Sequence, residues 1–302
     1  MANLNSQVKI PVRHDASPAQ LSINSSELLR QLRTAPELIL GHLQESFLQD
    51  ADLEAIDLFQ ANLSNICWLR INLQKADLSQ VNLQEATLNQ VNLSHADLSG
   101  ADLRDSKLRW VNLMEANLSG ADLTRASLRW TQFNDALLRG TVLRSTHMQH
   151  TDLSGADLVG TDLTLANLFR ADLCGAFVAE ARLDQADMRR SNWYQSLVRS
   201  SQFQQGNLRW ANFRGAELQL CNFQQASMQH CDLRGARLTQ VDLSGSYLQQ
   251  ANLEGAELYN CLLEGARVEA THFQGAKGLT DQQLLDLQAE GALVSVPTSA
   301  RD

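Results

Sequence analysis

Every fifth residue is apolar through most of this chain. From Leu48 to Phe273 the pattern gives 46 central positions without a slip. Two residues before each centre stands a small or compact residue, and alanine fills 23 of those 46 places. A period of five matches neither an α-helix, with 3.6 residues per turn, nor a β-strand, which alternates every two. It fits a coil of short straight segments joined by turns, each pointing one large and one small side chain inward. We therefore predict an all-β solenoid over residues 46–275.

A second period sets the length of one coil. The triplet Leu-Arg-Trp occurs at residues 108–110, 128–130 and 208–210. The second copy begins twenty positions after the first, and the third lies four such intervals beyond the second. Many of the glycines that follow the centres lie in two sets, one at 100, 120, 140 and 160 and one at 155, 175, 215, 235, 255 and 275, and the intervals within each set are multiples of the same length. Four repeats therefore complete one coil. At a strand spacing of roughly 4.8 Å, about 11.5 coils make a rod on the order of 55 Å long.

The residue before the centre is often Asp or Asn, as in Ala51-Asp52-Leu53 and Ala61-Asn62-Leu63. This A-(D/N)-L-x-x consensus closely resembles the pentapeptide-repeat family, over about 230 of the 302 residues. The resemblance implies a right-handed quadrilateral β-helix with four repeats per coil. It also favours a cyanobacterial-type member.

The two ends of the chain depart from the repeat, as the capping segments of a solenoid do. Residues 34–37 and 280–283 read as helical capping boxes, and Gly291 is a natural stop for the second helix. Such helices would cover the open edges of the first and last coils. We predict five parts: a disordered N-terminus (1–18), an N-terminal helical cap (19–45), the pentapeptide-repeat β-helix (46–275), a C-terminal capping helix (276–295) and a disordered tail (296–302).

Composition is that of a water-soluble protein. Charged residues make up 20% of the chain, the mean hydropathy is −0.26, and no apolar run is long enough to cross a bilayer. The first residues contain no apolar stretch typical of a secretory signal, and five cysteines do not suggest a disulfide framework. We expect a cytoplasmic protein without membrane contact. The formal charge of −9 argues mildly against wholesale nucleic-acid binding.

No motif points to catalysis. The sequence has no nucleophile elbow, P-loop, dinucleotide fingerprint or metal-ligand spacing, so we predict no enzyme, no catalytic residue and no cofactor. Cys221, Cys231 and Cys261 occupy the small inward position and are expected to pack in the core. His147 and His150 share one pentapeptide but lack a third ligand nearby, so no metal site is predicted.

The 20-residue coil assigns each outward residue to one of four faces. One face, centred on Leu48 and every twentieth residue to Val268, differs from the rest, and we call it the Arg/Trp face. It has nine cationic residues against Asp50, Asp187 and Glu269, a net charge of +6, while the other faces come to −5, −4 and −4. It also carries three of the five tryptophans. We expect Trp110 and Trp130 to stack directly, one coil apart, with an arginine beside each.

Exposed arginine and tryptophan are enriched at protein interfaces, so this face is the predicted partner-binding surface. Mere coverage of the sheet, and self-association through the face, are the alternatives. The predicted binding residues are Lys107, Arg109, Trp110, Arg129, Trp130, His147, His150, Phe169, Arg170, Arg189, Arg190, Arg209 and Trp210.

Three functions are compatible with this pattern. The leading hypothesis is a protein-interaction scaffold or regulator whose partner is an acidic protein, since charge complementarity favours one. The family resemblance implies a cyanobacterial setting such as heterocyst differentiation. It also implies the second hypothesis, a DNA mimic that acts on DNA gyrase, but such mimics are acidic where this face is basic. The third is nucleic-acid binding through the Arg/Trp face, which the overall charge opposes. Dimerisation through the C-terminal helix is left open and is not specifically indicated.

Overall fold

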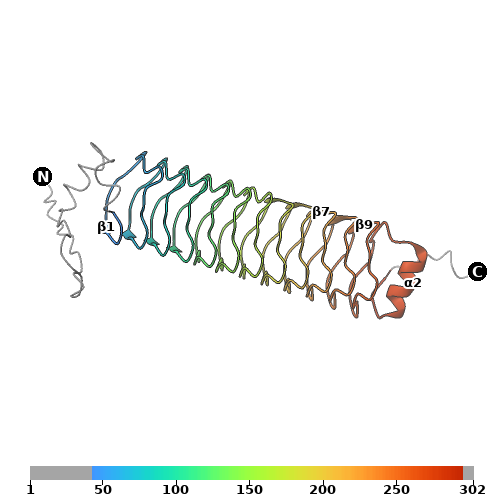
Figure 1. Cartoon of the computed structure of the whole chain (residues 1–302). Coiled ribbons are helices and arrows are strands. Elements are labelled where there is room, and N and C mark those ends of the chain that lie inside the picture. Colours follow the sequence, from blue (N-terminus) through green and yellow to red (C-terminus); the bar gives the residue numbers. More distant parts are fainter. Residues whose placement is uncertain (1–42, 295–302) are drawn as a thin grey trace, which may run out of the picture.

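The computed structural model describes residues 43–294. The chain forms a β-solenoid of about 11 turns, drawn as a straight rod from β1 to α2 in Figure 1. The predicted fold class is therefore confirmed. The two predicted disordered segments, and the predicted N-terminal cap up to residue 42 with its first capping box, lie outside the described residues.

Successive coils pair in parallel, each residue opposite the one a full coil later in the chain, as Leu48 opposite Trp68 shows. Most rungs are single bridges, such as the one between Asp52 and Asn72. Two runs are regular enough to count as sheets. On the Arg/Trp face the strands are β1 (Phe47–Gln49), β2 (Cys67–Leu69), β3 (Thr87–Asn89) and β4 (Lys107–Arg109). Two repeats further round the coil lie β5 (Phe177–Ala179), β6 (Leu197–Arg199), β7 (Glu217–Gln219), β8 (Arg237–Thr239) and β9 (Glu257–Tyr259).

The central positions of the repeats form one continuous core. Of the 46, 45 are buried, and only Leu263 in the last coil is partly exposed. Large rings concentrate in one stretch of this core. Phe203 and Phe223, one coil apart, stack with centroids 4.4 Å apart, and Trp193 stacks on Phe213 at 5.4 Å. Dispersion and burial of apolar area therefore act along the whole rod rather than in one globular centre.

The corners of each coil depend on a left-handed backbone at the fifth residue of the repeat. In one such corner the N–H of Ile56 donates to the carbonyl of Leu53 at 3.2 Å, and Ala55 between them has φ 55°. Because glycine reaches this region without steric cost, it recurs there, as at Gly100. Carboxylates before the centre bond locally: the N–H of Phe59 donates to Asp57 Oδ1 at 2.9 Å. These acids therefore stabilise the turns that follow them.

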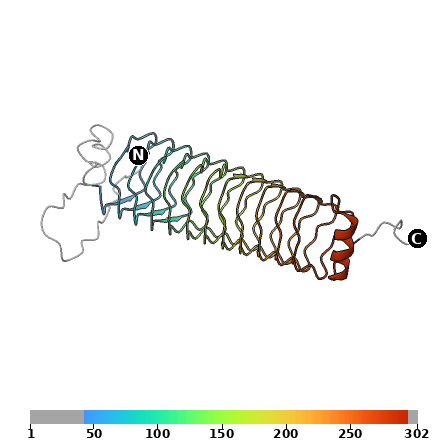
Figure 2. The same ribbon diagram turned by 45° about the vertical axis from the view of Figure 1, so that its right-hand side comes forward.

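Helix α2 (Asp281–Ala289) covers the C-terminal end of the rod, as Figure 2 shows. Thr280 and Gln283 form the capping box expected from the sequence, and Gly291 follows the helix with φ 89°. The chain then returns to the last coil, where the N–H of Phe273 donates to the carbonyl of Leu293 at 2.8 Å. No helix in the described part of the chain is long and apolar enough to span a membrane.

Candidate protein-interaction face

The fifth residues of the repeats on the Arg/Trp face form one column along the rod axis. Seven consecutive rungs of this column carry large side chains, and we call them the ladder. The three tryptophans of the ladder are about half exposed, at 46–53%. The parallel register that aligns the coils also aligns these side chains. The ladder consists of Trp110, Trp130, His150, Arg170, Arg190, Trp210 and His230.

The ring contacts differ from the predicted stack of Trp110 on Trp130. Trp130 lies instead on His150, with centroids 4.1 Å apart and 6° between the planes. Trp110 is covered by the guanidinium of Arg109, 4.3 Å from the centroid of the indole. The register of the coils places these rings on neighbouring rungs, but the side-chain rotamers determine which two rings stack. Here the guanidinium of Arg109 covers the Trp110 ring, so the predicted stack of Trp110 on Trp130 was wrong.

The same ring pair recurs four coils later. Trp210 and His230 have centroids 3.9 Å apart and planes 7° apart. Between the two pairs, the rings of His150 and Phe169 are nearly perpendicular with centroids 5.9 Å apart, and the guanidinium of Arg170 lies 5.3 Å from the Phe169 centroid. The face is therefore a set of ordered ring contacts separated by arginines.

Backbone strain accompanies these side chains. Trp110, Trp130 and Trp210 have φ of 54°, 64° and 66°, the left-handed region that bulky residues rarely adopt. Another column of the rod carries glycine at the equivalent rungs, as at Gly120 and Gly140. A bulky residue in such a region costs on the order of 1 kcal/mol. The same left-handed backbone recurs at the fifth residue of other repeats, as at Gln80 and Glu85, so it belongs to the fold and not to the ladder alone.

The cations of the face are largely unpaired. Within residues 43–294, only Arg70 and Arg189 of the nine have a carboxylate within ion-pair distance, from Asp50 and Asp187. On the other faces, eight of the eleven described lysines and arginines are paired. The unpaired cations of the Arg/Trp face are Lys107, Arg109, Arg129, Arg170, Arg190, Arg209 and Arg267. Unneutralised positive charge thus gathers on one side of an acidic rod.

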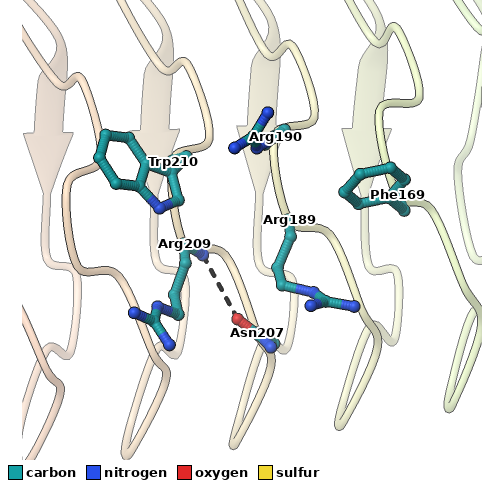
Figure 3. A pocket seen from close by; sticks show the side chains of 6 residues that line it. All are labelled: Phe169, Arg189, Arg190, Asn207, Arg209 and Trp210. Carbon is teal, nitrogen blue, oxygen red and sulfur yellow. Dashed lines mark hydrogen bonds between the residues drawn. The ribbon is translucent and has the colours of Figure 1, made fainter.

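A shallow depression of about 450 Å³ opens in this face between Phe169 and Trp210. Figure 3 shows the two rings at its ends and Arg190 between them. Arg189 and Arg209 complete the arginine lining, and Asn207 Oδ1 accepts from the backbone N–H of Arg209 at 3.5 Å. Asn207 was not among the predicted site residues. The 20-residue register was the signal for it, because that register places residue 207 on the same face.

The remaining predicted residues take different positions. Arg129 donates from Nε to Oε1 of Gln149 at 2.9 Å, so it lies along the face instead of over a ring. Lys107 and His147 are exposed in a neighbouring column, and His147 makes no ring contact of the kind that His150 makes. Arg267 was not predicted as a binding residue, yet its guanidinium lies 5.2 Å from the ring centroid of Tyr247.

The three inward cysteines are buried in the core of the rod. Burial raises the pKa of Cys221 and Cys261 to about 11, and that of Cys231 to about 12. Their sulfurs lie against backbone carbonyls, as Cys231 Sγ does at 3.0 Å from the Leu208 oxygen. The core position predicted for them is confirmed. No group of three or more metal-ligating side chains occurs among the residues that the structure describes.

The chain belongs to the pentapeptide repeat family. The model for pentapeptide repeats matches it in eight copies that together cover residues 71–164, 166–192 and 201–275. No curated protein sequence matches the chain.

Solved structures with similarity to this chain include two other pentapeptide repeat proteins and a fluoroquinolone resistance protein. HetL from the cyanobacterium Nostoc, described as involved in heterocyst differentiation regulation, is 26% identical, with 82% of this chain and 96% of HetL covered and a TM-score of 0.33. Full-length QnrB1, a plasmid-mediated fluoroquinolone resistance protein, is 15% identical, with coverages of 75% and 93% and a TM-score of 0.31. A protein of the Arabidopsis thaliana thylakoid lumen is 21% identical, with coverages of 54% and 85% and a TM-score of 0.25.

Proposed function

We propose that this protein is a non-enzymatic scaffold or regulator that binds an acidic segment of a protein partner along the Arg/Trp face. The main support for the proposal is that most cations of the Arg/Trp face lack a carboxylate partner. Seven of the nine on this face have no carboxylate partner in the described structure, while eight of eleven elsewhere do. An acidic segment would neutralise those charges and steer the encounter.

The side chains beside the cations support the same function. Three half-exposed tryptophans provide large apolar area next to guanidinium groups, which is the composition of energetically important interface residues. A cytoplasmic setting, and regulation of the heterocyst type, stay predictions from the sequence and its resemblance.

Affinity capture from a lysate tests the proposal. The test variant changes Arg109, Trp110, Arg129 and Trp130 to alanine. The matched control changes Arg199, Arg237 and Tyr259 to alanine, which are exposed on the other sheet. We expect wild type and control to retain one protein at low salt, and the test variant to lose it. The retained protein should be released as salt rises, because the exposed charges are then screened.

Other outcomes would contradict this function. Equal capture by all three proteins would show that the Arg/Trp face does not bind the partner. Release of the captured material by nuclease would instead support nucleic-acid binding, and DNA gyrase in the eluate would support mimicry of DNA.

A further inference from the structure

Two matching ring pairs stand at the ends of one stretch of the ladder. Trp130 lies on His150 and Trp210 lies on His230, with centroids 4.1 and 3.9 Å apart and planes 6° and 7° apart. Each histidine is the only ring or guanidinium contact of its indole within residues 43–294, and it lies on the following coil in both pairs. Both indoles are about half exposed. The rod therefore presents the same apolar surface twice along its axis.

Arginines occupy the rungs between the two pairs. Arg170 and Arg190 follow His150 on successive coils, and neither has an ion pair within the described residues. The nearby carboxylate of Asp187 is engaged by Arg189, through bonds of 2.7 Å from both Nε and Nη2. Along the rod axis, the order is therefore an apolar ring, two cations without a partner, and a second apolar ring.

The spacing of the two tryptophans selects the shape of a partner segment. Backbone bridges join every coil from Trp130 to Trp210, so four coil spacings separate them, or about 19 Å at roughly 4.8 Å per coil. In an extended chain, alternate side chains point to the same side, and six residues span roughly 20 Å. The first and seventh side chains of an extended segment along the rod therefore reach both indoles.

An α-helix fits this spacing less well. Thirteen residues of helix span about 19.5 Å, but the last side chain then points about 140° away from the first. Spacings of eleven and fourteen residues return close to the same side and span about 16.5 and 21 Å, so they miss the two tryptophans by roughly 2 Å or more. The third and fifth side chains of the extended segment also lie on the side facing the rod, at roughly 7 and 13 Å from the first. This places them over the rungs between the two ring pairs.

From this spacing we infer that the stretch from Trp130 to Trp210 binds an extended seven-residue segment of the partner protein. Its first and seventh side chains are large and apolar and pack on the two indoles. Its third and fifth side chains are acidic, and one carboxylate pairs with Arg170 and the other with Arg190. At Trp210 the depression gives the apolar side chain room beside the ring (Figure 3). The inference rests on the proposed function, since it names the shape and sequence pattern of the acidic segment.

Fluorescence polarisation at low salt with two labelled peptides tests the inference. The first peptide has phenylalanine at positions one and seven, glutamate at three and five, and serine at the others, so its sequence is the same in either direction along the rod. The matched peptide exchanges the last two residues, which keeps charge and composition but turns the second phenylalanine to the other side of the chain. Wild type should bind the first peptide at least about tenfold more tightly, because the matched peptide buries one aromatic side chain fewer.

Variants of the protein identify the groups that bind the first peptide. Arg170→Gln with Arg190→Gln should weaken it at least about tenfold, because two charged hydrogen bonds are lost. Arg199→Gln with Arg214→Gln removes the same charge from other faces, where neither arginine has an ion pair, and should change binding less than about twofold. Trp210→Leu should remove most of the advantage of the first peptide over the matched one.

Several results would overturn the inference. These are no binding of the first peptide, equal binding of the two peptides, and no loss with Arg170→Gln and Arg190→Gln. Tighter binding of an alanine-rich helical peptide with phenylalanines fourteen residues apart and two glutamates between them would also overturn it.

The capture experiment separates this inference from the proposed function. If Arg170→Gln with Arg190→Gln still retains the captured protein while the four-residue alanine variant loses it, the face binds its partner in another way and only the inference fails. If the four-residue alanine variant also retains the protein, the proposed function itself fails.

Discussion

The indole of Trp130 and the imidazole of His150 lie almost parallel, with centroids 4.1 Å apart, on neighbouring coils of the rod. Trp210 and His230 repeat that relationship four coils further along the rod. In both pairs the tryptophan precedes the histidine by one coil, and all four residues have positive φ. The stacks hold exposed rings in one orientation, which reduces the conformational entropy that a partner would otherwise have to remove.

The Trp130–His150 stack should appear as coupling in a double-mutant cycle. We expect Trp130→Ala, His150→Ala and the double variant to give a coupling of about 0.5–1.5 kcal/mol in the free energy of unfolding. Chemical denaturation measures it. A cycle of Trp110→Ala with His150→Ala is the control, because those rings are two coils apart, and it should be additive. Additivity in the test cycle would contradict the stack.

A side chain at residue 206 is predicted to destabilise the rod. It occupies a small inward position, where a Cβ would come within 2.9 Å of Met188 Cε and 3.0 Å of the Phe203 carbonyl oxygen. Because the carbonyl is backbone and cannot move away cheaply, Gly206→Ala should destabilise the rod by about 1–3 kcal/mol. The denaturation midpoint should fall accordingly. Ala226→Gly, one coil along the same column, should cost less than about 1 kcal/mol, and an unchanged midpoint for Gly206→Ala would contradict the close contact.

Thiol reactivity should follow burial. Cys67 is exposed and should react within the native protein with a disulfide reagent. Cys174 is half-buried and its pKa is raised, first by burial and then by Asp172, so it should react more slowly. The three buried cysteines, whose pKa values are about 11 to 12, should react only after denaturation. Stoichiometry at pH 8 before and after denaturant measures this, and Cys67→Ser should remove the fast phase.

Asp50 should become protonated only at unusually low pH. Hydrogen bonds from the Arg70 guanidinium, with a further one from Gln49, lower the pKa of Asp50 to about 2. Since the folded-state pKa is depressed, the pair stabilises the fold above the ordinary range near 3.9 and loses that effect as pH falls through about 2. The carboxyl resonance of Asp50 should titrate near pH 2 in wild type and higher in Arg70→Gln. Both groups are exposed, so thermal stability at pH 7 should change little. If Asp50 titrated at the same pH in Arg70→Gln as in wild type, the pairing of Asp50 with Arg70 would be contradicted.

Much of the candidate site followed from the repeat. Once the length of one coil is known, Arg190 and Trp210 must fall on one column, and the sum of charges by face needs no coordinates. The repeat did not predict which of the neighbouring arginines would be paired. Arg189 forms an ion pair with Asp187, whereas Arg190 has no ion pair within the described residues. Both are arginines on the same face, and only the direction of each side chain separates them.

The chain by itself determined the solenoid, the register and the face to which each side chain points. It could do so because large and small inward residues alternate with a period that only stacked coils satisfy, and backbone hydrogen bonds between coils then align every rung. The tertiary structure decided which neighbour each ring takes and which cations are neutralised. Those choices depend on side-chain rotamers and on competition between nearby groups, as where Arg109 covers Trp110 and leaves Trp130 to His150. The repeat pattern carries no information about that competition.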